Sequence, residues 1–525
     1  MRLTPLSKTF IAVVVLGVVG YTGYYYYGRG GLPFLKKGAG PAAADGGAAV
    51  APSGAGARAG AGKAPVRTGR RIVVGVNDFG GAYPAIVAND GATPGPRSIF
   101  KQKGLDVEIK LIKGSKERLK AFDAGEVDVM LLSLDYLAGL MPEYRAKGVE
   151  LRAFMMADWS RGNCGIVAKP QFKSIESLKT ARIATTKHTP THYLLLSLLA
   201  RSNLKPADID QVKQNLVFVT KTPLAGDVFQ RGESDAVAIW EPYLSQAAAS
   251  GKGKLLVSTE TATNLIADVL YARIEFLKAN EEVLPDFVRA WLEGVRLMET
   301  EPQRAVDVIS AAFKQPADET RNVIAKIKPA TFADNRAFFG LDVEDAPALR
   351  LFTEAARFWQ REGWVKTPVD GADLRWMKAL EAVAKDHATE RVVEKFAFKG
   401  EAAPQATADP LLTKSISIYF ASGSDKLDPN ARKVVDAFAE TLSVFQNAYV
   451  RVEGNTDAVG GRPANVALSK RRAMAVVEYL VARHKLEPRR FIAVGNGPDK
   501  PVGDNKTDEG RELNRRTEFK LIANR

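Results

Sequence analysis

The chain has 525 residues, 46% of them apolar, and a formal net charge of +14. This length is too great for one compact core, so we expect two or three domains. The basic surplus lies at the two ends: residues 1–70 hold nine Lys and Arg against one acid, and residues 413–525 hold twenty against fourteen. Basic ends fit an anionic membrane surface or cell wall. No recognisable nucleic-acid-binding motif accompanies them, so we expect no nucleic-acid partner.

Residues 1–30 are predicted to be a membrane anchor. Residues 10–27 form a run without a charged residue that is long enough for a spanning helix and ends in an aromatic belt of tyrosines. A cleavable signal peptide is the alternative, but no small-residue cleavage site closely follows the apolar core. Residues 31–70 are rich in Gly, Ala and Pro and are predicted to form a disordered linker.

Residues 71–398 are predicted to form an α/β domain. Short apolar strands alternate with helices up to about residue 240, and helices dominate from about residue 275. This alternation predicts a mostly parallel sheet, whose ligands bind beyond the carboxyl ends of the strands. One such end, residues 186–191, precedes a helix whose N-terminus suits an anion. The single cysteine, Cys164, excludes an intramolecular disulfide and is expected to be a buried, inert thiol.

Several segments of this domain carry a family resemblance, including GLDVEIKLIKGSKERLKAFDAGEVDVMLLS and GESDAVAIWEPYLSQA. In their order and spacing they resemble the periplasmic substrate-binding proteins of the nitrate, sulfonate and taurine class. The resemblance implies a two-lobed type II periplasmic-binding-protein fold that closes on a small anionic solute, for an ABC importer and its permease or for a sensor. By position, it also implies these ligand contacts: Asp78, Phe79, Ser133, Thr189, Trp240 and Glu241.

Other interpretations of these residues stay open. Asp78 and Ser133 could cap turns, and Trp240 could be a packing anchor. His188 and His192 have the i, i+4 spacing of half a zinc site, but no flanking cysteine or carboxylate completes it, so we expect no metal. No nucleophile–base pair or phosphate-binding loop is visible, so we expect neither catalysis nor a cofactor.

A second linker is predicted over residues 399–412, followed by a C-terminal α/β domain over residues 413–525. Strands are expected at 415–420, 449–454, 491–494 and 517–522, with helices at 428–445 and 463–483. Three motifs mark this domain: GNTD at 454–457, NVALSKRRA at 465–473 and GRELNRRTE at 510–518. Together they resemble the OmpA-like domain, a βαβαββ sandwich that binds peptidoglycan.

The resemblance implies that Asp457 and Arg472 hold the zwitterionic end of diaminopimelate in the stem peptide. The chemistry fits, because an ammonium needs a carboxylate and a carboxylate is held well by a planar guanidinium. Alternatively, Asp457 caps its loop and Arg472 pairs with a helix neighbour. Further residues implied to shape the pocket are Thr456, Asn465, Leu468 and Arg516.

These parts predict a single-pass inner-membrane protein with most of its chain in the periplasm. It would capture a solute while its C-terminal domain binds peptidoglycan. One alternative is a structural tether between membrane and wall with a degenerate binding domain. Another is a stator-like motor component, which the lack of an ionisable residue in residues 10–27 disfavours.

Overall fold

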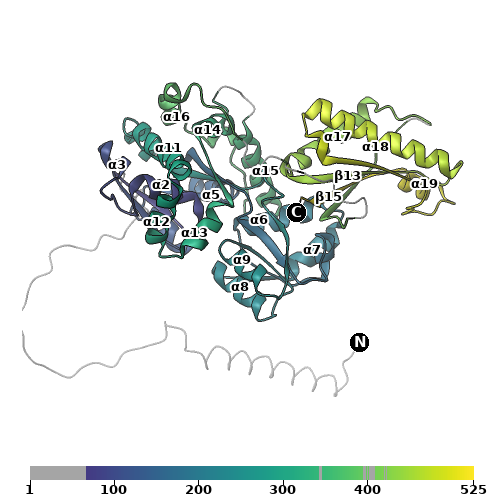
Figure 1. Ribbon diagram of the computed structural model, residues 1–525, viewed down its shortest axis with the longest axis horizontal. Coiled ribbons are helices and arrows are strands. Elements are labelled where there is room, and N and C mark those ends of the chain that lie inside the picture. Colours follow the sequence, from purple (N-terminus) through teal and green to yellow (C-terminus); the bar gives the residue numbers. More distant parts are fainter. Residues whose placement is uncertain are drawn as a thin grey trace, which may run out of the picture. The chain divides into compact units, whose positions relative to one another are not determined.

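The computed structural model describes residues 67–341, 346–393, 398, 400, 408–418, 420 and 423–524. The predicted anchor and most of both predicted linkers lie outside these residues. Within the described part of the chain, no helix is both long and apolar enough to cross a membrane. Residues 63–525 form one compact unit, in which three sheets are surrounded by helices (Figure 1).

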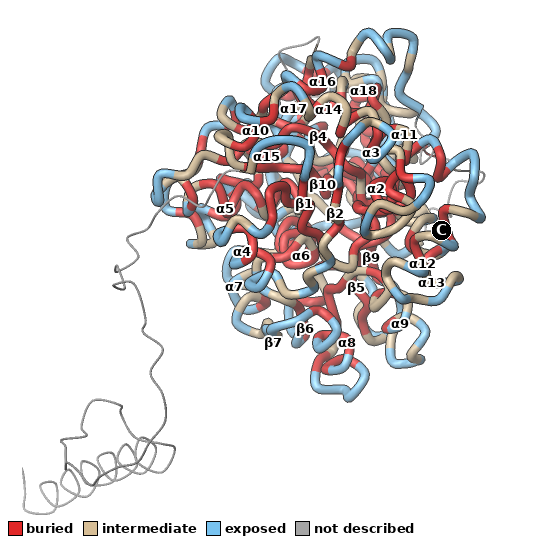
Figure 2. Tube along the Cα trace, turned by 90° about the vertical axis from the view of Figure 1, so that its left-hand side faces the viewer, coloured by how far each residue is buried: buried red, intermediate tan, exposed pale blue. Residues whose placement is uncertain are grey.

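The first lobe is built on a six-stranded sheet in the order β11-β4-β10-β3-β1-β2. Its strands are rich in Val, Ile, Leu and Met, as β-propensity and burial on both faces require. Figure 2 shows β1, β4 and β10 as buried. The strands are β1 (Arg71–Val76), β2 (Asp106–Leu111), β3 (Val129–Ser133), β4 (Leu151–Ser160), β10 (Ala267–Arg273) and β11 (Ile327–Pro329).

Helices cover this sheet, and the amphipathic helix α15 (Pro347–Arg361) illustrates how they are held. Its buried residues recur at helical spacing, and the fully buried Trp359 donates from Nε1 to the Asp135 carbonyl at 2.8 Å. The other helices are α2 (Tyr83–Asn89), α3 (Ile99–Gln102), α4 (Ser115–Asp123), α5 (Leu134–Ala146), α10 (Ile274–Ala279), α11 (Leu284–Thr300), α12 (Pro302–Phe313), α13 (Ala317–Ile324), α14 (Phe332–Phe339) and α16 (Lys378–Val383).

The second lobe is built on a five-stranded sheet in the order β7-β6-β8-β5-β9. Its strands are β5 (Cys164–Ala168), β6 (Ile183–Thr186), β7 (Leu216–Val219), β8 (Ala236–Trp240) and β9 (Lys254–Ser258). Its helices are α6 (Pro190–Arg201), α7 (Pro206–Gln214), α8 (Thr222–Gln230) and α9 (Tyr243–Ala249). Cys164 is buried at the start of β5, as expected.

The expectation of a mostly parallel sheet is wrong for both lobes, which are mixed. In the first lobe β1 pairs in parallel with β2 and β3, but β10 runs antiparallel between β3 and β4. The physical reason is that the chain crosses from the first lobe to the second after β4 and returns after β9. The returning strand enters the first sheet in the opposite direction, which alternation of strands and helices cannot reveal.

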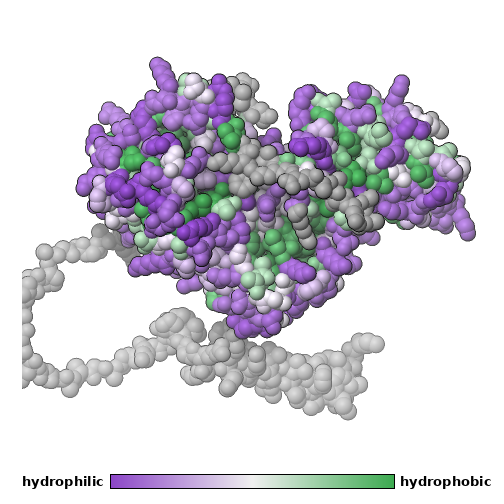
Figure 3. All heavy atoms as spheres, in the orientation of Figure 1, coloured by the Kyte–Doolittle hydropathy of each residue, from purple (hydrophilic) through white to green (hydrophobic). Residues whose placement is uncertain are grey.

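The C-terminal domain has a four-stranded sheet in the order β12-β15-β13-β14. Its strands are β12 (Leu412–Ile416), β13 (Ala448–Asn455), β14 (Phe491–Gly497) and β15 (Thr517–Ala523), and its helices are α17 (Pro429–Val444), α18 (Arg462–His484) and α19 (Asp508–Asn514). The first strand begins and ends earlier than the predicted 415–420, and the short α19 adds a helix to the expected βαβαββ order. The face shown in Figure 3 carries mainly hydrophilic side chains, with apolar ones in patches between them.

Helix α18 lies unusually close to β13 and β14 because glycines face it. A Cβ at Gly454 would lie 2.2 Å from the Ser469 carbonyl oxygen, and one at Gly495 would lie 2.5 Å from the Val466 carbonyl oxygen. Ser469 also accepts a hydrogen bond at Oγ from the Gly497 amide at 2.9 Å. These backbone contacts set the position of the helix that carries Arg472.

Gly454→Ala is expected to destabilise the C-terminal domain. Its methyl group would meet backbone atoms, which cannot rotate away as a side chain can, and overpacking of this kind costs about 1–3 kcal/mol. Thermal unfolding of the full chain would measure this as a lowered Tm. Gly461→Ala is the control, since a Cβ there meets nothing within 4 Å. Equal Tm values for the two variants would contradict this account of α18.

Candidate functional site

A small cavity of about 50 Å³ lies in the cleft between the two lobes. From the first lobe, the ends of β1 and β3 and helix α4 contribute to its lining; from the second, the start of β5, the start of α6 and the end of β8 do. Four predicted ligand contacts line it: Phe79, Ser133, Thr189 and Trp240. The sequence did not single out the other lining residues, which include Asn77, Ser115, Arg118, Tyr136 and Asp268.

A row of polar side chains crosses three neighbouring strands at this edge of the first sheet. Asp268 on β10 stands opposite Ser133 on β3 and opposite Asp158 on β4 in the strand register. All three are at most 5% exposed. Like charges directly opposite one another on neighbouring strands are destabilising, so this pairing of two carboxyl groups is costly for the fold.

The carboxyl groups near the cavity have raised pKa values. Burial raises the pKa of Asp158 and of Asp268, and Coulomb repulsion from neighbouring carboxyl groups adds to it. Burial also raises the pKa of Asp135 to about 7. The pKa of the Cys164 thiol is raised by burial and by the same acids, which disfavours its thiolate form.

The remaining two predicted contacts, Asp78 and Glu241, lie outside the cavity lining and connect the lobes instead. Tyr243 of α9 donates to Asp78 at 3.3 Å. Lys326 of the first lobe pairs with the buried Glu241, and its Nζ lies 2.9 Å from Ser245 Oγ. These contacts hold the lobes together, which is why so little space remains in the cleft.

The start of α6 has fewer free amide donors for an anion than its sequence predicts. Thr189 caps the helix by accepting from the His192 amide, and its hydroxyl donates to the Thr186 carbonyl at 2.7 Å. Pro190, the first residue of the helix, has no amide proton to give. The helix terminus is therefore largely satisfied by its own residues.

The two histidines in this region pack against aromatic rings rather than forming a metal site. The His188 ring stacks on Trp364 with centroids 4.0 Å apart, and the His192 ring lies over Trp359. Burial lowers the pKa of His188 to about 4 and that of His192 to about 3. Across the described ranges no group of three or more His, Cys, Asp or Glu could hold a metal ion.

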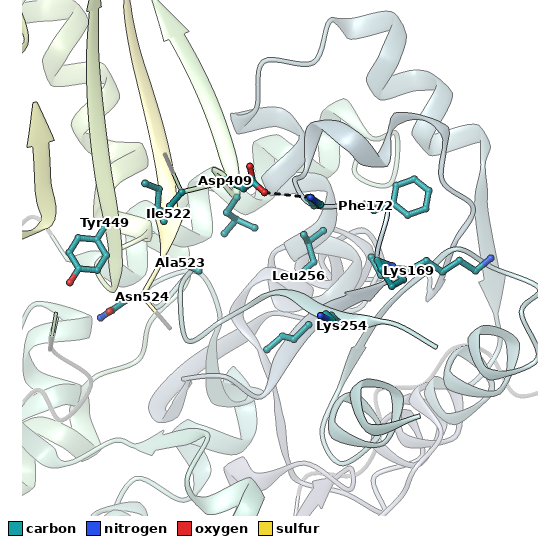
Figure 4. Close-up of a pocket in the computed structure, with 15 residues that line it drawn as sticks. Lys169, Phe172, Lys254, Leu256, Asp409, Tyr449, Ile522, Ala523 and Asn524 are labelled. Carbon is teal, nitrogen blue, oxygen red and sulfur yellow. Dashed lines mark ion pairs between the residues drawn. The ribbon is translucent and has the colours of Figure 1, made fainter. Parts of the chain in front are cut away.

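A larger cavity of about 550 Å³ is lined by residues of β5, β9, β13 and β15 and by their flanking loops (Figure 4). Its ion pair, between Lys173 and Asp409 at 3.8 Å, has both side chains more than 70% exposed and contributes little stability. None of the buried, unpartnered side-chain atoms in the described residues belongs to its lining. The cleft between the lobes is therefore the better candidate for a solute.

The C-terminal domain has a pocket of its own, of about 40 Å³, where β13 ends and β15 begins beside α18. Arg472 of α18 lines it, donates from Nε to the Ser424 carbonyl at 2.9 Å and lies over the Phe420 ring at 4.9 Å. Burial lowers the pKa of Arg472, Asp425 and Asp457 oppose that shift, and Arg515 adds to it. Several charges thus converge on this pocket.

Asp457 pairs with Arg515 rather than with Arg472. Its Oδ2 lies 2.7 Å from Arg515 Nη1, and its Oδ1 accepts from the Val459 amide at 3.1 Å. Arg515 also lines the pocket, so it joins Asp457 and Arg472 as a third charged candidate. Its neighbour Arg516 lines the pocket too, but its guanidinium is bound to Glu518 and to the Lys500 carbonyl.

The other predicted pocket residues shape the loop that carries Asp457. The Thr456 amide donates to the Gly497 carbonyl at 2.9 Å, and Asn465 donates to the Val459 carbonyl at 2.9 Å. Leu468 is half-buried on α18.

One organising residue escaped the sequence analysis. The fully buried Asn514 bonds Val502, Gly503 and Asn505, and Asn505 in turn accepts from the Ala458 amide beside Asp457. Its position beside Arg515 and Arg516 in the GRELNRRTE motif, here called the NRR motif, was the one sign of its importance in the sequence.

Two protein families match separate parts of the chain. Residues 419–515 match the OmpA family, and residues 97–305 match the family described as NMT1/THI5 like. The chain is 32% identical to outer membrane protein A of Bordetella avium over 125 residues, 23% of this chain and 64% of that protein. The peptidoglycan-associated lipoprotein of Pseudomonas putida is 36% identical over 104 residues, 20% of this chain and 61% of that protein. The chain thus spans less than two thirds of these relatives.

Two solved structures are similar to the middle of the chain. The periplasmic aliphatic sulphonate-binding protein of Escherichia coli is 18% identical, with a TM-score of 0.48 over 60% of this chain and 100% of that one. The periplasmic nitrate-binding protein of Synechocystis is 13% identical, with a TM-score of 0.47 over 60% of this chain and 89% of that one.

Asp135→Asn is expected to make the ligand-free protein more stable at high pH. An acid with a folded pKa of about 7 favours the folded state at low pH, and this contribution is lost as the pH rises from about 4 through 7. The neutral amide cannot titrate, so the Tm at pH 8 should rise by roughly 2–4 °C for each kcal/mol regained.

The measurement is thermal unfolding of the full chain between pH 4 and pH 8. The isosteric control is Asp318→Asn, whose parent side chain is 97% exposed. If the Asp135 variant and the parent keep the same Tm difference at every pH, the buried carboxyl group does not titrate as described.

Proposed function

We propose that this chain, which combines an NMT1/THI5-like domain with an OmpA family domain, is a solute-binding protein held at the bacterial cell wall. The observation that carries the proposal is the cavity between two α/β lobes, lined by buried polar atoms that have no partner in the described structure. Such atoms cost stability unless a ligand or water satisfies them. On this proposal the protein binds its solute without transforming it.

The lobes supply the binding mechanism. Solute would enter when the contacts of Tyr243 with Asp78 and of Lys326 with Glu241 break, and those contacts would re-form around it. A cavity of about 50 Å³ has room for only a few waters, so binding of a larger molecule requires the lobes to separate. The captured solute would then pass to an ABC permease or be reported to a sensor.

The C-terminal domain would bind peptidoglycan through Asp457, Arg472 and Arg515. A diaminopimelate stem peptide offers an ammonium for Asp457 and a carboxylate for the guanidinium groups. Arg515 already neutralises Asp457 at 2.7 Å, so the ligand would share or displace this contact. Residues 10–27 would anchor the chain in the inner membrane, with the binding domains in the periplasm.

The closed cleft also keeps a second function under consideration, that of a structural tether between membrane and wall whose solute site is no longer used. The contacts that join the lobes would suit a rigid spacer. A tether would show no stabilisation by any small solute, whereas a binding protein is stabilised by mass action.

Asp457→Ala and Arg472→Ala are each expected to reduce sedimentation of the full chain with purified sacculi by at least tenfold. Each change removes one partner of a charge-assisted contact and leaves the other unpaired. Arg515→Ala should weaken binding too, because it lines the same pocket.

Arg489→Ala is the matched control, since this arginine is 66% exposed, pairs locally with Glu487 and does not line the pocket. Sedimentation of the Asp457 and Arg472 variants at the level of this control would exclude peptidoglycan binding through the pocket.

A further inference from the structure

The lining of the cleft cavity presents both acceptors and donors that lack partners. Among the buried side-chain atoms without a hydrogen-bond partner are Asp268 Oδ2, Ser133 Oγ, Trp240 Nε1 and Arg118 Nε, and all four residues line the cavity. Ser133 and Arg118 are only 3% and 2% exposed. A folded protein rarely leaves so many buried polar atoms unmatched in one place, so the cavity has the character of a built binding site.

Three buried carboxyl groups gather on one side of this site. Behind Asp268 stand Asp158, directly opposite it across the strands, and Asp135, whose charge raises the pKa of Asp268. The positive group facing this cluster is Arg161, which opposes the raised pKa of Asp158. In the described residues this set does not form a metal site. These carboxyl oxygens can accept hydrogen bonds, so a ligand nitrogen that donates would suit them.

Helix α4 supplies the cavity with a possible donor, Arg118. Arg118 donates from Nη1 to the Ile112 carbonyl at 2.7 Å, which leaves its Nε without a partner. Ser115, at the start of the same helix, lines the cavity beside it. Arg118 Nε can therefore donate a hydrogen bond to an acceptor on the ligand.

Aromatic side chains complete the lining, because Phe79, Tyr136 and Trp240 all contribute to it. Aromatic faces attract cations and pack against planar groups. The α6 terminus, which would have favoured an anion, is capped by Thr189, and Pro190 at its first position has no amide proton.

We propose that the cleft selects a small solute carrying a nitrogen donor, such as an ammonium or amidinium group, for Asp268 and a hydrogen-bond acceptor for Arg118. A solute that offers only an oxoanion would leave Asp268 and its neighbouring carboxyl groups unmatched. This inference rests on the proposed solute-binding function and replaces the anionic solute implied by the sequence with a donor-bearing one.

The test uses matched pairs of probes at 10 mM in thermal unfolding of the full chain. Benzamidinium and benzoate have the same shape and opposite charge. Taurine and isethionate share a sulfonate, and only taurine has an ammonium. Benzamidinium and taurine are expected to raise the Tm by at least 2 °C more than their partners. Nitrate and phosphate are included as simple oxoanions.

Asp268→Asn should abolish this preference, since the amide keeps the size of the side chain and removes its charge. Asp318→Asn, an exposed acid, should keep it. If Asp268→Asn fails to unfold cooperatively, Asp158→Asn, on the neighbouring strand, carries the test.

The outcomes separate the two proposals. Greater stabilisation by benzoate, isethionate, nitrate or phosphate, or a preference that survives Asp268→Asn, would overturn the nitrogen-donor inference and leave solute binding intact. Stabilisation by none of the probes would contradict solute capture itself and favour the tether.

Discussion

The return of β10 into the first sheet is the constraint from which the cleft follows. Because the chain crosses between the lobes twice, β10 must lie antiparallel between β3 and β4. This arrangement brings Asp268 between Ser133 and Asp158 at the edge of the sheet, next to the crossings themselves. The same crossings connect the two lobes, and Thr259 secures this connection with contacts to Ser160 Oγ at 2.7 Å and to the Gly162 amide at 2.9 Å. The lining of the cavity and the connection between the lobes therefore come from one topological feature.

Burying carboxyl groups opposite one another works against folding, and the rest of the domain has to offset that cost. The first lobe does so with a large apolar core and with anchors such as Trp359, which ties α15 to α5. Uncompensated polar groups that persist inside a well-packed core are expected where function requires them. The unmatched atoms of the cleft, rather than its volume, are thus the strongest physical sign of a ligand.

The C-terminal domain holds oppositely charged side chains close to one another. Close backbone contacts at Gly454 and Gly495 set α18 and hence Arg472. The Asn514 network sets the loop that carries Asp457. Arg515 forms an ion pair with Asp457. Arg472 donates to the Ser424 carbonyl and lies over the Phe420 ring. Arg472 and Arg515, which come from separate elements, thus meet at one pocket.

The sequence by itself indicated α/β domains and several of their strands and helices, because hydrophobic periodicity and turn chemistry are local properties. It also identified the motif carrying Asp457 and Arg472. Only the tertiary structure decided that β10 is antiparallel, that Asp268 and Arg118 line the cleft, and that Asp78 and Glu241 join the lobes instead. Likewise, nothing in the NRR motif distinguishes Arg515, which meets Asp457, from Arg516, which is bound to Glu518. These outcomes depend on which distant segments pack together, and strand direction and side-chain partners are properties of that packing rather than of any local pattern.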